Sequence, residues 1–346
     1  MKKHQVLLLT ALLAVFASAG IWGFWKFNQK INNLHDSYET LEKHVEESIE
    51  ELRGEIAAQA SETEEENRNL TVIPDLDPHG EGWKITQFGD VNGAQENCYT
   101  ITTANGLAIV DGGFAYEEPR LREIIAQYGN SVDAWILTHP HGDHMTAFLD
   151  IYKDPQGIVF HHIYTPEMPD LSVMMENADW DDYTLLEELN KLEIPQLEYL
   201  HNGDERSILG LRMKVLSAYD DEIDKISDDL MNDGSLVFKL SGEKESMLFC
   251  ADAGDPYVNE ELSERIIREY GDELPSDYLQ LGHHGFGGLT PELYDIVDAE
   301  GVFIDAPALL LTSTEFISAR ENDLRMEEQG RVVFSFYTAP NQVLLR

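Results

Sequence analysis

Positively charged side chains are scarce in this 346-residue chain. Its 24 lysines and arginines stand against 65 aspartates and glutamates, which gives a formal net charge of −41 at pH 7. A field of that sign repels nucleic-acid backbones and anionic membrane surfaces unless a local basic patch intervenes. We therefore do not expect duplex nucleic acid among the partners of this protein.

Cysteine is limited to two residues, Cys98 and Cys250, so the chain forms at most one disulfide. Each cysteine lies in a short apolar run, which favours a pair of buried thiols and leaves a disulfide between them open. Hydrophobic residues make up 42% of the chain, enough to bury a core. The length allows one large domain with accessory segments, or two ordinary domains.

Charge is absent from one long stretch near the N-terminus. Residues 5–25 carry no charged side chain, and lysines flank this stretch on both sides. As a helix it would be about 31 Å long, enough to cross the core of a bilayer. We expect residues 1–26 to form a short cytoplasmic tail and a transmembrane anchor, with the rest of this single-pass protein extracytoplasmic. The alternative is a signal peptide cleaved after "ASA" at 17–19 and a secreted protein.

Residues 27–56 place apolar side chains at spacings of mostly four and three, the heptad pattern of a coiled coil. These side chains are Phe27, Ile31, Leu34, Tyr38, Leu41, Val45, Ile49, Leu52 and Ile56. We expect residues 27–70 to form a coiled-coil stalk that ends in the acidic linker "SETEEENRNL" and makes the chain a homo-oligomer. The alternative is a single amphipathic helix that lies against the rest of the chain.

The remaining residues, 71–346, contain 53 of the acidic and 17 of the basic side chains. Short β-rich runs such as "WKITQFG" and "GSLVFKLSG" alternate there with stretches of helical pattern at 117–128 and 181–192. This alternation predicts a mixed α/β class. Because the second half repeats the pattern of the first, we expect two sheets packed face to face with helices outside.

Side chains with unusual chemistry stand at the ends of four apolar strands. Asp111 ends "AIVDGG", "HPHGDH" at 139–144 follows "WILT", Asp252 ends "LFCADAG", and His283 and His284 follow "YLQLG". Rigid scaffolds present functional groups in loops at such ends, so we expect one shared site. Four metal-binding side chains within six positions have no packing rationale, and imidazole with carboxylate suits zinc, manganese or iron.

With these motifs the chain resembles the metallo-β-lactamase superfamily, whose HxHxDH signature "THPHGDH" matches. "VDGG", "CADAG" and "GHHG" follow in the order of that family, and the resemblance covers about residues 83–290. It implies a catalytic domain over 71–346 with a four-layer αββα sandwich. The doubled histidine, "NDGSLVFKL" at 232–240 and "ADAG" resemble in particular the extracytoplasmic domain of ComEC-type DNA-uptake proteins.

The resemblance implies a site for two divalent metal ions, zinc preferred, with manganese or iron as alternatives. The implied ligands are His139 and His141 for the first ion, Asp143, His144 and His283 for the second, and Asp252 for both. Asp111 would orient the histidine loop. His284 would either donate a proton to the leaving group or cap its loop.

The chain departs from the family in one place. Members with a complete first site supply a third histidine before a central strand, and the matching place here reads "MNDG". Asn232 or Asp233 would fill that role, or the first ion is held more openly. The ComEC-type domains share this gap.

These ligands imply a hydrolase in which a metal-bound hydroxide attacks a carbonyl or phosphorus centre, with Asp143, Asp252 and His284 as catalytic residues. The ComEC-like motifs indicate a phosphodiester, and the acidity of 71–346 favours a small phosphodiester or another small ester outside the membrane. One alternative is a lactone or β-lactam hydrolase. The other is a non-catalytic membrane-tethered scaffold with a degenerate metal site.

Overall fold

A computed structural model describes residues 82–254, 259–311, 326, 330–335 and 339–346. All of them belong to the second of the two compact units of the chain, Leu70–Arg346. The expected anchor at 1–26 and stalk at 27–70 lie outside the described residues, and both stay predictions. In the part that is described, no helix is long and apolar enough to cross a membrane.

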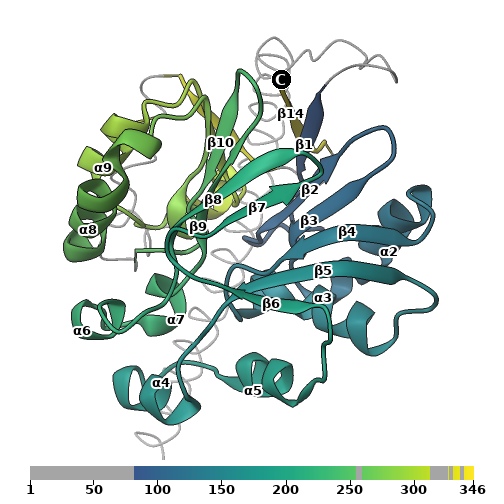
Figure 1. Ribbon diagram of the computed structural model, residues 1–346, viewed down its shortest axis with the longest axis horizontal. Helices are drawn as coiled ribbons and strands as arrows, with labels where there is room; N and C mark the ends of the chain where they lie inside the picture. The colour runs from purple at the N-terminus through teal and green to yellow at the C-terminus, as the bar shows by residue number, and fades with distance from the viewer. Residues whose placement is uncertain (1–81, 255–258, 312–325, 327–329, 336–338) are drawn as a thin grey trace, which may run out of the picture. The chain divides into compact units, whose positions relative to one another are not determined.

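Seven strands form the first sheet (Figure 1). In spatial order they are β14 (Asn341–Leu345), β1 (Trp83–Gln87), β2 (Cys98–Thr102), β3 (Leu107–Asp111), β4 (Ser131–Ile136), β5 (Val159–Pro166) and β6 (Leu197–Leu200). The strands from β14 to β3 pair antiparallel, and those from β3 to β6 pair parallel. β2 and β3 are buried along their whole length, as expected of apolar central strands covered on both faces.

Seven strands also form the second sheet (Figure 1). In spatial order they are β13 (Val332–Phe334), β12 (Gly301–Ile304), β11 (Tyr278–Gln280), β10 (Ser246–Phe249), β9 (Val237–Ser241), β8 (Leu211–Ser217) and β7 (Glu205–Ile208). The pairs from β13 to β10 are parallel, and those from β10 to β7 are antiparallel. Each sheet therefore has a parallel half. The strands that precede the metal-binding motifs, β3 and β4 in the first sheet and β10 and β11 in the second, belong to these parallel halves.

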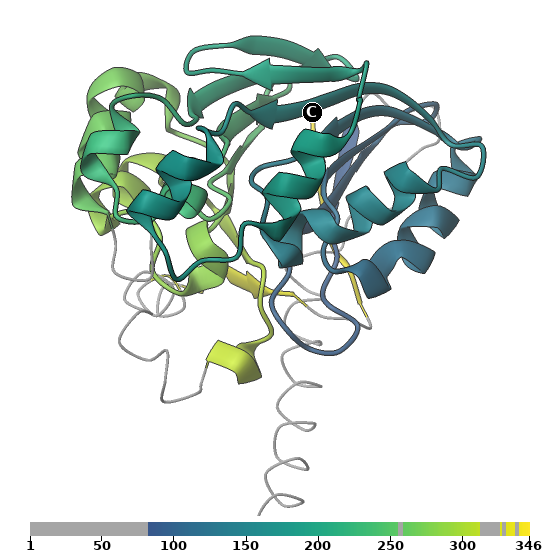
Figure 2. The same ribbon diagram turned by 90° about the horizontal axis from the view of Figure 1, so that it is seen from below.

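Helices cover the outer faces of the two sheets (Figure 2). The described α-helices are α2 (Glu118–Gln127), α3 (Gly142–Lys153), α4 (Leu171–Asn177), α5 (Thr184–Lys191), α6 (Ile223–Ile226), α7 (Leu230–Asp233), α8 (Glu260–Tyr270), α9 (Pro291–Val297) and α10 (Ala308–Leu311). The short 3₁₀ helices are η1 (Ala115–Glu117), η2 (Gly271–Glu273) and η3 (Gly282–Gly285). α2 and α5 fall within the predicted helical stretches 117–128 and 181–192, whereas the sequence pattern did not predict α3.

Three buried apolar clusters separate the layers. One joins α2, α3 and α5 to the first sheet, one joins α8 and α9 to the second sheet, and the third lies between the sheets. In the third, the ring of Phe249 stacks on Phe238 at 4.8 Å and meets the edge of Tyr99 at 5.2 Å. Three apolar interfaces give four layers. The predicted two-sheet α/β sandwich is confirmed.

Cys98 and Cys250 are both buried and both free. Burial raises the pKa of each thiol above its usual value, so both stay protonated. They lie in different apolar clusters, Cys98 under α2 and α3 and Cys250 under the helices of the second sheet. The prediction of two buried thiols is therefore confirmed, and the two cysteines form no disulfide with each other.

Candidate metal centre

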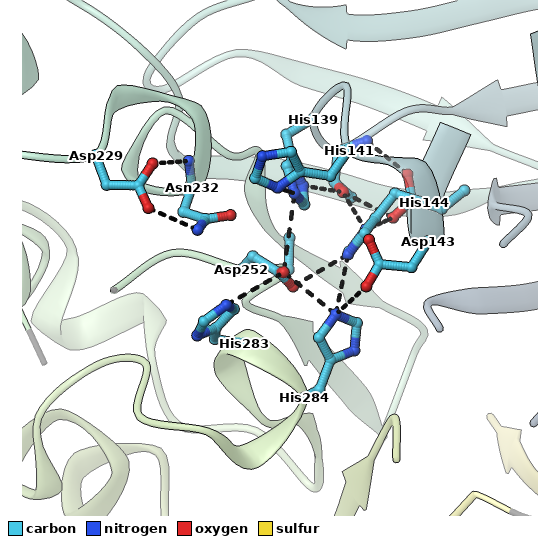
Figure 3. A network of polar contacts seen from close by, with 12 residues as sticks. His139, His141, Asp143, His144, Asp229, Asn232, Asp252, His283 and His284 are labelled. Carbon is cyan, nitrogen blue, oxygen red and sulfur yellow. Dashed lines mark hydrogen bonds and ion pairs between the residues drawn. The ribbon is translucent and has the colours of Figure 1, made fainter. Parts of the chain in front are cut away.

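Polar side chains from both sheets meet where strands β3, β4, β10 and β11 end (Figure 3). Asp111 is the last residue of β3, the histidine loop follows β4, Asp252 follows β10, and His283 and His284 lie in η3 after β11. β3 and β4 are parallel, as are β10 and β11, so their carboxyl ends lie at the same edge of each sheet. We call the seven side chains that gather there the histidine cluster: His139, His141, Asp143, His144, Asp252, His283 and His284.

His139, His144 and Asp252 form the buried centre of the histidine cluster. The two histidines are 0% exposed and Asp252 is 2% exposed. Nε2 of His144 lies 3.2 Å from Oδ1 of Asp252, and Nε2 of His139 lies 3.8 Å from Oδ2. One ligand atom from each residue lies within 4.8 Å of the other two, which is the spacing of ligands around a single metal ion.

Asp143, His144 and His284 form a second group with the same spacing. Nε2 of His284 lies 3.3 Å from Oδ2 of Asp143, 3.2 Å from Oδ2 of Asp252 and 3.2 Å from Nε2 of His144. Asp143 and His144 are consecutive in the first turn of α3, so this part of the histidine loop is helical. The buried apolar face of this helix packs against the first sheet.

His141 and His283 lie nearer the rim, with side chains 21% and 17% exposed. Nδ1 of His141 lies 3.0 Å from Nε2 of His139, and Nε2 of His283 lies 3.9 Å from Oδ2 of Asp252. Both His283 and His284 have positive φ, 48° and 54°, a region that non-glycine residues seldom adopt. This turn sends the two rings to different sides of Asp252, and it is His284 that meets Asp143 and His144 (Figure 3). The assignment of His283 to the second ion stays a prediction.

Hydrogen bonds from outside the cluster set the tautomers of two buried histidines. Nδ1 of His144 lies 2.8 Å from Oδ2 of Asp111, and Nδ1 of His139 lies 3.2 Å from Oγ1 of Thr138. Thr138 donates its hydroxyl hydrogen to Asp111 at 2.7 Å, so its oxygen is left to accept from His139. In their neutral forms both rings then carry hydrogen at Nδ1, and each directs its Nε2 lone pair into the cluster. Asp111 therefore contacts the histidine loop at both Thr138 and His144, and its role in orienting metal ligands stays a prediction.

Two imidazoles and two carboxylates in the cluster stabilise one another's charged forms. Burial opposes protonation of His284, but Asp252 and Asp143 outweigh it and raise its pKa to about 10. Burial likewise opposes protonation of His144, but Asp252 and Asp111 raise its pKa well above the usual value. The same contacts hold the pKa of Asp252 below its usual range against the effect of burial. Because a ring nitrogen binds either a proton or a metal ion, cations would replace protons on these rings.

His139 and His283 are held neutral. Burial, reinforced by the charge of His144, lowers the pKa of His139 well below its usual value. Burial also lowers the pKa of His283 to about 4. Neutral imidazole is the form that binds a metal ion, so these two rings are ready to act as ligands at neutral pH.

Asn232 and Asp233, the two candidates for the missing ligand, have different environments in α7. Oδ1 of Asp233 accepts from the backbone of Gly254 at 3.0 Å, and Oδ2 accepts from Asn259 at 2.7 Å, so this carboxylate anchors the turn after β10. Asn232 donates to Asp229 at 2.8 Å, and its own Oδ1 is buried without a hydrogen-bond partner. Figure 3 shows that oxygen facing the histidines.

The donor set fits divalent metal ions. Imidazole nitrogens and carboxylate oxygens converge, and the buried Oδ1 of Asn232 finds no partner within the protein. Buried polar atoms cost free energy when they stay unpaired, and a cation would satisfy them. Zinc, manganese and iron accept this mixture of nitrogen and oxygen ligands.

Three residues of the site were not predicted from the sequence. Thr138 links Asp111 to the histidines, Asp229 holds Asn232, and both carboxylate oxygens of Asp181 lie 3.2 Å from Nε2 of His141. Thr138 could have been found from its place at the start of "THPHGDH". Asp181 and Asp229 lie in stretches dense in acids, where spacing does not distinguish one carboxylate from the next.

The described residues form a two-sheet α/β sandwich with a candidate site for divalent metal ions where strands of both sheets end. Residues 91–188, which include Asp111, the histidine loop and Asp181, match the family model of the metallo-beta-lactamase superfamily. No sequence among curated proteins matches the chain.

Solved structures with similar folds come from proteins of distant sequence. The metallo-beta-lactamase fold protein YhfI from Bacillus subtilis is 13% identical, with 77% of this chain and 100% of that chain covered and a TM-score of 0.46. CmlA, a diiron beta-hydroxylase from Streptomyces venezuelae, is 14% identical, with 77% of this chain and 54% of that chain covered and a TM-score of 0.48. The chain therefore spans about half the length of that protein. A diphosphatase of the PhnP family is 9% identical, with 77% of this chain and 98% of that chain covered and a TM-score of 0.42.

Proposed function

We propose that this protein is a hydrolase that depends on two divalent metal ions held in the histidine cluster. The observation that carries the proposal is the convergence of imidazole nitrogens and carboxylate oxygens at one buried place, with outer hydrogen bonds that turn the lone pairs of His139 and His144 inward. The proposed ligands are His139, His141, Asn232 and Asp252 for the first ion, and Asp143, His144, Asp252 and either His283 or His284 for the second.

Ions bound there would lower the pKa of a water molecule and polarise the bond to be cleaved. The protein itself contributes orientation and a low-dielectric setting. Asp111 and Thr138 hold the rings of His139 and His144, and the burial of these rings strengthens every electrostatic interaction among them. Where His283 rather than His284 holds the second ion, His284 would keep a proton at Nε2 between Asp143 and Asp252, and it is then our candidate to pass a proton to the leaving group.

The substrate that we propose is a small phosphodiester or another small ester. Residues 71–346 contain 53 acidic and 17 basic side chains, too few cations to neutralise a long polyanion. A small ester needs no such neutralisation beyond the two ions. The likeness to ComEC-type domains, which rests on "NDGSLVFKL" and "GHHG", supports a phosphodiester over a monoester. We place this reaction outside the membrane, in a protein anchored by residues 1–26 and associated through residues 27–70.

The test is a substrate panel on the full-length chain loaded with Zn²⁺ or Mn²⁺. The panel contains bis(p-nitrophenyl) phosphate, p-nitrophenyl phosphate, a chromogenic lactone and a chromogenic β-lactam, and bound metal is counted by atomic emission. We expect two ions per chain and turnover of the phosphodiester. Asp143→Asn should lower kcat at least about 100-fold, since it removes a ligand of the second ion. Asp179→Asn, which removes the same charge at an exposed position, should match the wild type.

Other results would replace the proposal. Turnover of only the lactone or the β-lactam would establish the alternative hydrolase. Two bound ions without turnover of any member of the panel would contradict the proposed substrate class. A chain that binds no metal after supplementation would support the scaffold alternative.

A further inference from the structure

Both ring nitrogens of His141 have a polar neighbour, one inside the histidine cluster and one outside it. Nδ1 lies 3.0 Å from Nε2 of His139, inside the histidine cluster. Nε2 lies 3.2 Å from each carboxylate oxygen of Asp181, which belongs to the connection between α4 and α5. The side chain of Asp181 is only 10% exposed, so water competes little for these oxygens.

The contact with Asp181 determines where the hydrogen of a neutral His141 ring lies. An ionised carboxylate only accepts hydrogen bonds, so the nitrogen that faces Asp181 must be the N–H donor. Nδ1 is then left as a lone pair, and it is the nitrogen that faces His139. Without Asp181 the ring would be free to carry its hydrogen at Nδ1, where it blocks a metal ligand.

Asp181 lies on the opposite side of the ring from the cluster. Because the two ring nitrogens of an imidazole point in divergent directions, the partner of Nε2 cannot bind the ion that Nδ1 binds. The arrangement is the carboxylate–histidine pair that orients a metal ligand from behind.

The connection that carries Asp181 is held in place by its own hydrogen bonds. Tyr183 donates its hydroxyl hydrogen to the carbonyl oxygens of Met174 and Ala178, at 2.9 and 2.6 Å. Asp182 accepts from the backbone and the hydroxyl of Thr184 at the start of α5. The backbone on both sides of Asp181 is therefore anchored, which lets this carboxylate hold His141 at low entropic cost.

We infer that Asp181 is a positioning residue, which keeps His141 in the Nε2–H tautomer and so presents Nδ1 to the first metal ion. This inference rests on the proposed metal centre, but not on hydrolysis or on any substrate. It adds to the histidine loop a carboxylate some forty positions further along the chain. The ligand whose binding Asp181 affects is a divalent cation.

The experiment measures metal affinity and not activity. Full-length wild type, Asp181→Asn, Asp181→Ala and Asp181→Glu are titrated with Zn²⁺ in competition with a chromogenic chelator. We expect Asn and Ala to weaken binding of one of the two ions by roughly 10–100-fold, the effect usual for such a partner, and to leave the other ion unchanged. Glu, which keeps the carboxylate, should recover part of the affinity. The visible spectrum of the Co²⁺-loaded Asp181→Asn protein should shift, because the geometry around one ion changes.

Asp179→Asn is the matched control, since Asp179 is an exposed acid in the same connection. Wild-type affinity and an unchanged Co²⁺ spectrum in Asp181→Asn would overturn the inference. So would a loss confined to the melting temperature of the metal-free protein, because that result marks a purely structural role. A wild type that binds metal but hydrolyses nothing, with weakened binding in Asp181→Asn, would support this inference while the proposed function fails. A wild type that binds no metal would overturn both.

Discussion

Oδ2 of Asp111, at the end of β3, lies 2.8 Å from Nδ1 of His144, in the first turn of α3. The same carboxylate accepts hydrogen bonds from the backbone and the hydroxyl of Thr138, both at 2.7 Å. A single buried side chain therefore holds the start of the histidine loop and one of its rings. The backbone of Asp111 has φ of 52°, a value that asparagine tolerates better than most residues.

Asp111→Asn should weaken metal binding by roughly 10–100-fold without preventing folding, because the amide keeps the shape but can no longer select the tautomer of His144. Chelator competition on the full-length chain measures the affinity. Thr138→Ser, which keeps the hydroxyl, is the control and should bind as the wild type does. Equal affinities for Asp111→Asn and wild type would contradict the role assigned to Asp111.

Asn232→Ala and Asp233→Ala should affect different properties. The buried Oδ1 of Asn232 faces the histidines, so its loss should weaken binding of one ion in a metal titration. Asp233 bonds to Gly254 and Asn259, so its loss should lower the free energy of unfolding by about 1–3 kcal/mol in a urea titration. If Asp233→Ala lost the ion and Asn232→Ala kept it, the assignment would have to be reversed.

Glu96→Gln should change how stability depends on pH. Burial raises the pKa of Glu96 to about 9, with Glu117 and Asp90 acting in the same direction and Arg120 against them. The folded state then holds a proton that an unfolded glutamate loses near pH 4.5. The contribution of Glu96 to stability is complete below pH 4.5 and is lost as the pH rises toward 9, by at most about 1.4 kcal/mol per pH unit.

Urea unfolding between pH 5 and 9 tests this expectation. Gln has no proton to lose in that range, so Glu96→Gln should flatten the decline seen in the wild type. Glu123→Gln, which changes an exposed carboxylate of α2, should leave the decline as it is. An identical slope in Glu96→Gln and wild type would show that Glu96 does not hold its proton.

Phe249→Ala should destabilise the sandwich by about 3–5 kcal/mol, because it leaves a cavity between the two sheets. Its ring contacts Phe238 and Tyr99 from both sheets and is fully buried. Met175→Ala, at a side chain 53% exposed, should cost no more than about 0.5 kcal/mol. Chemical unfolding of both variants measures the difference, and similar losses would argue against a core between the sheets.

The full-length chain should not bind duplex DNA at physiological salt, because its net charge of −41 repels the phosphate backbone. Fluorescence anisotropy with a labelled duplex measures this directly. A sub-micromolar dissociation constant would show that a basic patch overcomes the overall charge, and would reopen nucleic acid as a partner.

The strands and the histidine loop could be predicted from the sequence because their signals are local. "NCYTITTANGLAIVDGG" contains the strands β2 and β3 that the structure shows, and apolar runs indicated most of the second sheet. α3 was not predicted, because its first turn carries the metal-binding residues of the histidine loop. These residues indicated a loop, and the helical pattern of the residues that follow was therefore not recognised. β14 could not be placed, since its pairing with β1 joins Trp83 to Leu345 across nearly the whole described length.

By itself, the sequence determined the class of fold and the supply of nitrogen and oxygen donors, because apolar periodicity and residue type are properties of short segments. Only the tertiary structure decided which of two neighbouring histidines meets Asp143. His284 reaches Asp143 where His283 does not, because two consecutive residues with positive φ turn their rings apart. The structure also decided that Asp111 and Asp181 hold the rings of His144 and His141, since that depends on where separate strand ends and connections meet in space.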